Sequence, residues 1–427
     1  MSRFRSVLLS SGVLCASLLM TLAHSRPAFA EMRTVVIDGD LDVDGIVTYS
    51  DTHLQVLGNV NLLRNGSLIL DRCVVEVVGK FARQYAYNWR GGTLTTRDTT
   101  IGGTLRDGVA QQANFNLNDG LWTAVDTTVR YTYGIQFSYE TVGRLRATRL
   151  KQGPNPDSII VAGKGDVELA DSTYMIALNL QLRGDKATLD LPNDTPITRT
   201  IDGSNMPGAT FRLKLNNVTV PDFWFLFFYD VSMTGKPTEI TLKGCKKFLP
   251  SIMGTDLTGE VTLGKGLERP LTIGNLTIRR DGNDSVEAFA MGLYLRGKRN
   301  DLVLNGPIVI CELMMFEGGR VTLKGTKTYD AACTATTLDL HGSSQVELID
   351  ARLGRPLQHG PIAAGDPLAA VIGQVTVGDQ AQLVGRNVSL GRLHLITRGD
   401  GRMRFGPYTT TDTLDKTQHG GKIEFDP

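Results

Sequence analysis

Short segments in which apolar residues alternate with other residues recur along most of the chain, separated by glycine or polar turn residues. In the segment 65–78, a glycine turn is followed by Leu68 and Leu70, a polar corner at Asp71 and a second apolar stretch. Similar segments occur at 165–172, 209–217, 238–245, 319–325 and 345–351. Because side chains alternate between the two faces of a strand, this pattern predicts short β-strands, and its repetition predicts a solenoid.

The spacing of these segments predicts the length of one coil. Pairs such as Ile240/Leu242 and Val321/Leu323 recur in the second half, often about 17–21 residues apart. A coil of this length has room for three short strands and three turns, and coils of a parallel β-helix stack about 4.8 Å apart. We therefore expect an all-β fold, a single parallel β-helix domain of roughly 15 coils with loop insertions over residues 31–427. A sandwich of antiparallel hairpins is disfavoured, because its tight two-residue turns are not apparent.

Polar residues recur at one place in the repeated segment, namely Asp71, Asp171, Asn217 and Asp350. We expect them to be inward-facing corners whose side chains bond backbone groups, and therefore to be structural. Interruptions of the strand pattern predict the insertions, at 80–90, 106–120, 152–157, 192–208 and 351–370.

The first 30 residues have the pattern of a secretory signal. Arg3 and Arg5 precede an apolar run over 7–22, and Ala28-Phe29-Ala30 supplies small residues on either side of one larger residue. We expect cleavage after Ala30 and a secreted or periplasmic protein. No second apolar stretch of about 20 residues follows, so we expect no membrane span after signal removal.

Charge and cysteine content narrow the functional classes further. The 45 Lys and Arg nearly balance the 44 Asp and Glu, and a net charge of +1 lacks the basic surface of a nucleic-acid binder. The 47 glycines fit a turn-rich β protein. Cys311 and Cys333 lie about one coil apart, so they either bridge adjacent coils or remain free and buried.

Several short phrases resemble those of secreted right-handed parallel β-helix proteins, the pectate-lyase-like superfamily. They include Gly66-Ser-Leu-Ile-Leu-Asp-Arg-Cys73, Ile37-Asp-Gly39 and Ile201-Asp-Gly203. The resemblance extends over most of the chain after residue 30 and implies a right-handed parallel β-helix. Members of that superfamily include polysaccharide lyases, glycoside hydrolases, epimerases, phage tailspikes and non-catalytic adhesins. The chain lacks the Trp-Ile-Asp-His run of pectate lyases and the paired-Asp and Arg-Ile-Lys signatures of polygalacturonases, so neither of those activities is expected.

The segment 80–90 is the first candidate for a sugar-binding loop. Tyr85, Tyr87 and Trp89 occupy alternating positions and can stack on sugar faces. Arg83 and Arg90 can pair with hydroxyl or carboxylate groups. Arg83, Tyr85 and Tyr87 are also catalytic candidates for a lyase, since arginine can neutralise a uronate carboxylate and tyrosine can move the C5 proton. The alternative is a loop that folds its aromatic residues onto the outside of the coil.

A basic stretch is the second candidate. Arg144 and Arg146 share a face if this stretch is a strand, and can then line an anion-binding groove that holds substrate. The alternative is a solvated face that nearby acids neutralise. The stretch also includes Arg130, Arg149 and Lys151.

The run 222–230 is the most apolar segment after the signal. Alternation puts Phe225, Phe227 and Tyr229 on one face, with Phe223, and puts Trp224, Leu226 and Phe228 on the other. One face must fill the coil, and the other must be covered by the 192–208 loop, a second chain or a ligand, so Trp224 is a candidate for binding substrate. The flanking Asp222 and Asp230 are candidates for the carboxylate pair of a hydrolase.

A row of aspartates near the start of the mature chain suggests one cofactor. The spacing Asp40-x-Asp42-x-Asp44-Gly45, with Asp51 at the twelfth position, partly resembles a calcium loop, so Ca²⁺ is a candidate ligand. The outer face of a strand gives the same spacing. A solvated first coil that caps the solenoid is the alternative.

These patterns lead to two functional hypotheses. The first is an exported β-helix that binds an extracellular polysaccharide or cell-surface glycan and, if it is an enzyme, cleaves it as a lyase or glycoside hydrolase. The second is a non-catalytic surface, adhesion or structural scaffold. Titratable groups that converge on one face would favour the enzyme, and a groove without them would favour the scaffold.

Overall fold

The computed structural model describes most of the chain after the first 31 residues. The described residues are 32–80, 83–106, 109–153, 159–205, 210–220, 224–262, 264, 266–306, 309–326, 337–354, 373–391, 393–410 and 414–426. They form β-strands and one short 3₁₀ helix, Gly203–Asn205. The largest sheet has 25 strands, and most of its pairings are parallel. This confirms the all-β prediction and fits a parallel β-solenoid. No helix in the described part is long and apolar enough to cross a membrane.

In the first half, each coil contributes to three strand faces. Face 1 contains β1 (Arg33–Ile37), β4 (Thr52–Val56), β7 (Val74–Val77), the ends of β8 (Ala86–Gly102) and β11 (Ala113–Arg130), and β14 (Lys151–Gln152). Face 2 contains β2 (Leu41–Val43), β5 (Val60–Leu62), the starts of β8 and β11, β12 (Thr132–Gln136), β15 (Ile159–Ala162) and β17 (Ile176–Gln181). Face 3 contains β3 (Ile46–Ser50), β6 (Ser67–Asp71), the middles of β8 and β11, β13 (Gly143–Thr148), β16 (Gly165–Ala170) and β20 (Arg212–Thr219).

Face 2 continues without a break through the second half. It passes to β21 (Trp224–Ser232), β23 (Lys247–Thr255), β27 (Ala288–Arg296), β29 (Val309–Met315), β31 (Thr337–Leu340), β34 (Gly373–Val377), β37 (Leu393–Arg398) and β40 (Leu414–His419). The other sides are divided among separate sheets.

One of these separate sheets has seven strands and extends to the end of the described chain. It contains β24 (Thr258–Thr262), β28 (Asp301–Asn305), β30 (Arg320–Lys324), β32 (Gln345–Ile349), β35 (Gln382–Arg386), β38 (Arg402–Phe405) and β41 (Lys422–Phe425). Two smaller sheets accompany it. They contain β18 (Lys186–Asp190), β22 (Thr238–Lys243), β26 (Leu276–Arg280) and β25 (Leu271–Ile273), and β33 (Arg352–Leu353), β36 (Val388–Leu390) and β39 (Tyr408–Thr410).

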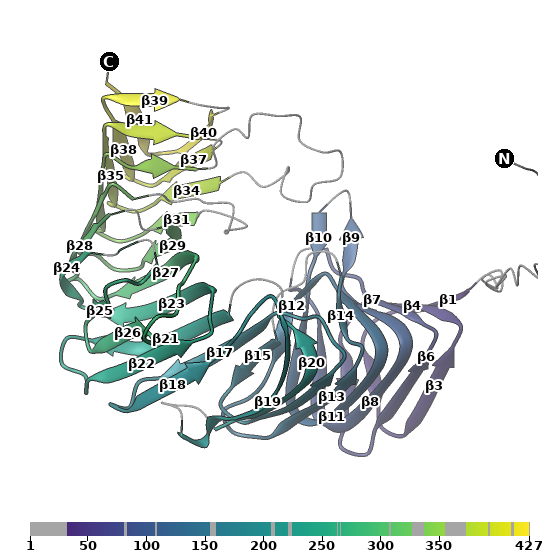
Figure 1. Cartoon of the computed structure of the whole chain (residues 1–427). Coiled ribbons are helices and arrows are strands. Elements are labelled where there is room, and N and C mark those ends of the chain that lie inside the picture. Colours follow the sequence, from purple (N-terminus) through teal and green to yellow (C-terminus); the bar gives the residue numbers. More distant parts are fainter. Residues whose placement is uncertain are drawn as a thin grey trace, which may run out of the picture.

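The solenoid is bent into two arms. Figure 1 shows the arms meeting near β17, β21 and β23, with β31, β34 and β37 on the inner side of the bend and β35 and β38 on the outer side. Between β17 and β21 the chain inserts β18 and β19 (Pro196–Asp202) before the face 3 strand β20, and β19 pairs antiparallel with β20. Face 2 stays continuous across this insertion, because β17 pairs directly with β21.

Large apolar side chains fill the coils. Leu68 and Leu70 are almost fully buried, as the alternation predicts for one face of a strand. The predicted interruptions at 80–90 and 106–120 are shorter than expected, because β8 begins at Ala86 and β11 at Ala113. Between these two long strands, the hairpin of β9 (Thr104–Arg106) and β10 (Val109–Gln111) forms a two-stranded sheet of its own.

Successive coils share a corner between faces 3 and 1 that requires a positive φ. The residues there are Asp51, Arg72, Asp98, Asp126, Arg149, Asp171 and Asn217, with φ between 46° and 54°. Asp171 and Asn217 are exposed at this corner, as is Asp350 at the corresponding corner of the second half, so the prediction that they face inward is wrong. Asp71 lies one residue before its corner, which Arg72 occupies. Asp and Asn tolerate the left-handed region better than most residues because their short polar side chains bond locally.

The residue after the corner points inward and bonds to the backbone. Thr52, Thr99 and Ser172 donate their hydroxyl hydrogens to the carbonyls two residues earlier, at 2.7, 2.8 and 2.7 Å. Cys73 occupies this position in its coil, and its Sγ lies 3.3 Å from the Asp71 carbonyl. Cys73 is free and buried in a site that threonine or serine fills elsewhere.

The other cysteines have different environments. Cys245 is also free, and burial raises the pKa of its thiol to about 12. Cys311 is disulfide-bonded. Cys333, its predicted partner, lies outside the described residues.

Candidate functional site

The first predicted site is largely part of the core. Tyr87 and Trp89 are 1% and 2% exposed and stack with neighbouring aromatic rings, with Tyr87 4.4 Å from Phe115 between ring centroids. The Tyr87 hydroxyl donates to the carbonyl of Gly102 at 3.0 Å, and burial raises the pKa of that hydroxyl. A polymer in solution therefore cannot reach Tyr87 or Trp89, and they are structural.

The remaining residues of that segment are separated. Tyr85 is partly buried and packs against the core, whereas Arg90 is exposed within β8. The Arg83 guanidinium lies 3.4 Å from the centre of the Tyr133 ring, a cation–π contact. Arg83 therefore lies against a tyrosine of β12, outside its own segment.

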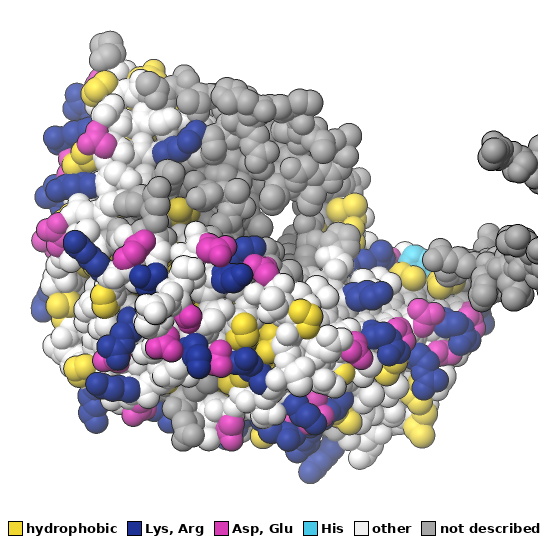
Figure 2. All heavy atoms as spheres, in the orientation of Figure 1, with side chains coloured by type: hydrophobic (Ala, Val, Ile, Leu, Met, Phe, Trp, Pro, Cys, Tyr) yellow, Lys and Arg dark blue, Asp and Glu magenta, His cyan; other side chains and the backbone are white. Residues whose placement is uncertain are grey.

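Nearby acids neutralise much of the basic stretch. Arg130 pairs with Glu76 at 2.5 Å, Arg146 with Asp166 at 2.6 Å, and Arg149 with Asp126 at 2.5 Å. Arg144 is exposed on the same outer side of face 3 as Arg146. Figure 2 shows positive and negative side chains side by side over the visible surface. This arrangement matches the solvated-face alternative better than an anion-binding groove.

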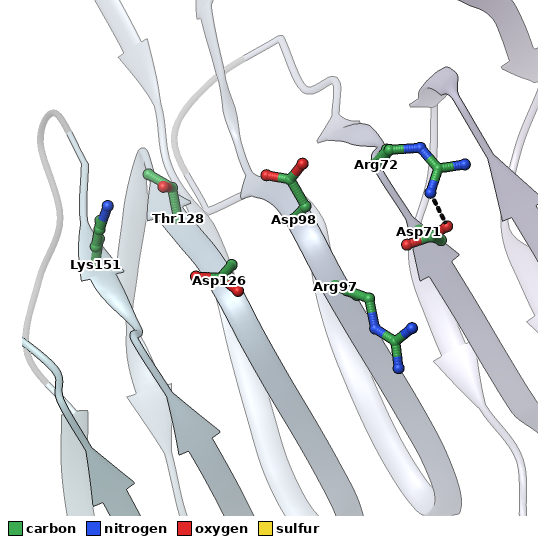
Figure 3. Close-up of a pocket in the computed structure, with 7 residues that line it drawn as sticks. All are labelled: Asp71, Arg72, Arg97, Asp98, Asp126, Thr128 and Lys151. Carbon is green, nitrogen blue, oxygen red and sulfur yellow. Dashed lines mark hydrogen bonds and ion pairs between the residues drawn. The ribbon is translucent and has the colours of Figure 1, made fainter. Parts of the chain in front are cut away.

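A hollow follows the corner between faces 3 and 1. It has a volume of about 540 Å³, and Figure 3 shows its lining residues, which come from four successive coils. Arg72 pairs with Asp51 at 2.7 Å and with Asp71 at 2.5 Å, so acids satisfy its charge. A second hollow, of about 290 Å³, lies at the corresponding corner of the second half. Because a hollow occurs at this corner in both halves of the molecule, we attribute both hollows to the shape of the coils. The lining residues of the first are Asp71, Arg72, Arg97, Asp98, Asp126, Thr128 and Lys151.

The candidate calcium residues bond to amides of the next coil. Asp40 Oδ1 accepts from the backbone and side chain of Asn59 at 2.7 and 3.1 Å, and Asp42 Oδ1 accepts from Asn61 at 2.7 Å. The Asn59 backbone N–H, partly opposed by burial, holds the pKa of Asp40 below its usual value. Asp44 is exposed beside Gly45. Among the described residues, no group of three or more His, Cys, Asp or Glu side chains is arranged to hold a metal ion.

The apolar run divides between core and surface as alternation predicts. Trp224, Leu226 and Phe228 are fully buried, so Trp224 is a core residue and cannot bind substrate. Phe225, Phe227 and Tyr229 are partly exposed on the outer side of face 2. Asp230 is exposed, whereas Asp222 and Phe223 lie outside the described residues.

The inner side of the bend brings together a set of residues that we call the elbow surface. Pairing in register places Asn179 beside Phe227, Phe227 beside Ser251, and Ser251 beside Gly292. Gly292 in turn lies beside Glu312, and Tyr294 beside Met253. The elbow surface consists of Tyr133, Tyr139, Asn179, Tyr229, Tyr294 and Glu312.

The bend, and not the sheet register, brings Tyr133 near Tyr294. Their strands, β12 and β27, are separated by β15, β17, β21 and β23, which would place them about 24 Å apart in a flat sheet. Burial is the largest cause of the raised pKa of Tyr294, and Glu312 is the next. Tyr133 and Tyr229 also raise this pKa, although Tyr133 lies in the other arm. Residues from both arms therefore share one electrostatic environment.

The polar groups of the elbow surface include one close pair and one open acceptor. The Tyr294 hydroxyl donates to Glu312 Oε2. Burial raises the pKa of Tyr229 to about 12, and Tyr139 and Tyr133 add to that rise. Burial also raises the pKa of Tyr139, while the Asn179 amide acts in the opposite direction. Asn179 is 9% exposed, and its Oδ1 accepts no hydrogen bond in the described structure.

This arrangement can bind a polyhydroxylated molecule. The tyrosine rings provide faces for stacking, and their hydroxyls, the Asn179 amide and the Glu312 carboxylate provide hydrogen-bonding groups. Of this set only Tyr229 is marked by the sequence, through the alternating apolar run. Tyr133 and Tyr294 share no motif, and their strands are far apart in the sequence.

Comparisons with protein-family models, curated proteins and solved structures found no match to the chain.

Proposed function

We propose that this protein is an exported polysaccharide-binding solenoid that holds its ligand on the elbow surface. We also propose the finer architecture, a right-handed β-helix of roughly 15 coils similar to those of the pectate-lyase-like superfamily. The observation that carries the proposed function is a group of interacting polar side chains on strands of both arms: Tyr294 donates to Glu312, and Tyr133 contributes to the raised pKa of both Tyr294 and Tyr229.

The chemistry of the elbow surface suits sugar rings. The C–H faces of a sugar can pack on the partly exposed rings of Tyr229 and Tyr139, while its hydroxyl groups exchange hydrogen bonds with Asn179 and Glu312. An extended polymer fits a surface made from successive coils, because parallel coils repeat their side chains at regular spacing.

If the bound polymer is cleaved, Glu312 and Asp230 are candidate carboxylates, because each interacts with a tyrosine of the elbow surface. Glu312 accepts the Tyr294 hydroxyl, and Asp230 contributes to the raised pKa of Tyr139. Glycoside hydrolases use two carboxylates, so this pair replaces the predicted pair of Asp222 and Asp230 as the first to be substituted.

Binding to a panel of soluble polysaccharides tests the proposal, measured by affinity electrophoresis and calorimetry. Tyr229→Ala is expected to weaken binding about tenfold, since it removes a stacking surface worth about 1 kcal/mol beyond its buried area. Tyr408→Ala is the matched control, because Tyr408 is exposed on β39 at the far end of the molecule. An equal loss in both variants would contradict the elbow as the binding surface.

The same panel separates binding from cleavage and from a scaffold role. Release of reducing ends identifies a hydrolase, and a rise in absorbance near 235 nm with reducing ends identifies a lyase. A folded protein that binds no polysaccharide would contradict the proposal and favour the adhesion scaffold. One observation favours that scaffold, an apolar cluster outside face 2 formed by Leu249, Ala290, Val309 and Cys311 with Phe225.

A further inference from the structure

A second carboxylate lies on the strand next to Glu312. On β31, Leu338 and Leu340 are fully buried, so Asp339 between them points to the outer side of face 2, as Glu312 does on β29. Asp339 is partly exposed, and its Oδ1 lies 3.0 Å from Nε2 of His341, which follows the strand. Glu312 and Asp339 are therefore two carboxylates on one side of one sheet.

The strand register determines the spacing of these two residues. Glu312 is paired with Thr337, so Asp339 is one strand across and two residues along. Strands about 4.8 Å apart and a rise of about 3.3 Å per residue put their Cα atoms about 8 Å apart. Because side chains stand roughly perpendicular to a sheet, the carboxyl groups have a similar separation. Glycoside hydrolases hold their two carboxyl groups about 5–9.5 Å apart. Asp230 is three strands from Glu312, so Asp339 is the better-placed partner.

Each carboxylate is held by a neighbouring side chain that can also share a proton. The Tyr294 hydroxyl on β27 donates to Glu312 Oε2. His341 lies between Asp339 and Asp379, with its Nδ1 3.8 Å from Asp379 Oδ2. The imidazole therefore fixes the orientation of Asp339 and can share a proton that Asp339 accepts.

The surface beside this pair also has an open position for a ligand. Asn179 is 9% exposed, and its Oδ1 accepts no hydrogen bond in the described structure. Such an acceptor costs stability unless something else donates to it. In strand order, Tyr229 and Tyr294 lie between Asn179 and the carboxylate pair. A polymer that packs on these tyrosines would therefore continue over the two carboxylates.

From this arrangement we infer that the protein is a glycoside hydrolase with Glu312 and Asp339 as its catalytic pair. The inference rests on the proposed function and adds a reaction to it. Glu312 in its carboxylic acid form gives a proton to the glycosidic oxygen, as the bond between that oxygen and the anomeric carbon breaks. Asp339 takes a proton from the water whose oxygen bonds to the anomeric carbon, and His341 is a positioning residue for Asp339. Each cleavage consumes one water and leaves a hydroxyl on both sugar ends, and solvent carries the proton from Asp339 back to Glu312.

Cleavage and binding by the same variants test this inference. The protein is incubated with cello-, manno-, xylo- and galacto-oligosaccharides and with oligogalacturonate, and products are followed as reducing ends and by NMR of the anomeric proton. We expect one series to be cleaved with inversion, because a separation of about 8 Å leaves room for water. Glu312→Gln and Asp339→Asn should each lower kcat about 10²–10⁴-fold and leave the Kd measured by calorimetry almost unchanged. His341→Gln should lower kcat without changing KM.

A matched control and four outcomes separate this inference from the proposed function. Asp415→Asn should change neither kcat nor Kd, because Asp415 is an exposed acid on the same side of face 2, on β40. Binding of a series with no cleavage of any would overturn the inference and leave the proposed function standing. Undiminished cleavage by Asp339→Asn would overturn the inferred pair, and a retained anomer would overturn the direct attack of water. A folded protein that neither binds nor cleaves would overturn both proposals.

Discussion

At the scale of single residues, the corner between faces 3 and 1 determines which side chains the chain accepts. Asp98, Asp126 and Asp171 have φ values of 46°, 49° and 46°, in the region that most L-residues avoid. Asp and Asn are enriched there because their short side chains bond nearby backbone groups. The recurrence of acids and amides in the sequence therefore reflects backbone conformation, and these residues are poor candidates for catalysis.

Substitution of Asp98 tests this explanation. Asp98 is exposed and takes part in no ion pair in the described structure. We expect Asp98→Val to lower the free energy of unfolding by about 1–2 kcal/mol relative to Asp98→Gly, because a β-branched residue is strained at positive φ. Asp98→Asn should be neutral. Denaturant unfolding followed by circular dichroism gives the comparison, and equal stability of the Val and Gly variants would contradict it.

At the scale of strands and coils, glycine sets how closely one coil stacks on the next. A Cβ at Gly66 would collide with the carbonyl oxygen of Val43 in the coil below, and a Cβ at Gly143 would collide with that of Leu117. Gly45 holds the same place in the first coil, and a Cβ there would have no such neighbour within 4 Å. The need for glycine therefore comes from stacking and appears only where a coil lies beneath.

Gly66 and Gly45 form a matched pair for a stability test. Gly66→Ala should lower the free energy of unfolding by about 1–3 kcal/mol, because the backbone must shift to make room for the methyl group. Gly45→Ala should be neutral or stabilising by up to about 1 kcal/mol, since alanine restricts the unfolded chain more than glycine does. Thermal unfolding measures both, and a larger loss for Gly45→Ala would refute the stacking explanation.

Sequence patterns predicted the strands better than they predicted the site. Alternation separated Trp224 and Leu226 from Phe225 and Tyr229, and the structure buries the first pair and partly exposes the second. The same reasoning placed Tyr87 on an external loop, whereas it packs in the core. Alternation identifies which residues share a face, but it does not identify the inner face when both are aromatic or polar.

At the scale of the whole molecule, the bend creates the candidate site. Tyr133 and Tyr294 are far apart in sequence and in sheet order, and only the change in axis direction brings them together. No local motif marks that change, which lies where β18 and β19 are inserted between β17 and β21. The elbow surface was therefore inaccessible to prediction from spacing or residue type.

Solution scattering tests the bend directly. A straight solenoid of about 15 coils would be a rod about 70 Å long, with the pair-distance distribution of an elongated body. We expect the purified protein to give small-angle X-ray scattering that fits the two arms of Figure 1 and does not fit such a rod. A rod-like profile would separate Tyr133 from Tyr294 and remove the basis of the elbow surface.

The continuity of face 2 also determines which changes of shape the molecule can make at low energetic cost. Its parallel pairings are unbroken from β2 to β40, whereas the other sides of the second half are divided into separate sheets. The two arms can therefore rotate toward or away from each other by curling one sheet about an axis parallel to its strands, which leaves its backbone hydrogen bonds intact. Such bending would change the distance between Tyr133 and Tyr294 gradually. On the proposed function, such bending would let the elbow surface fit polymers of different thickness without unfolding a coil.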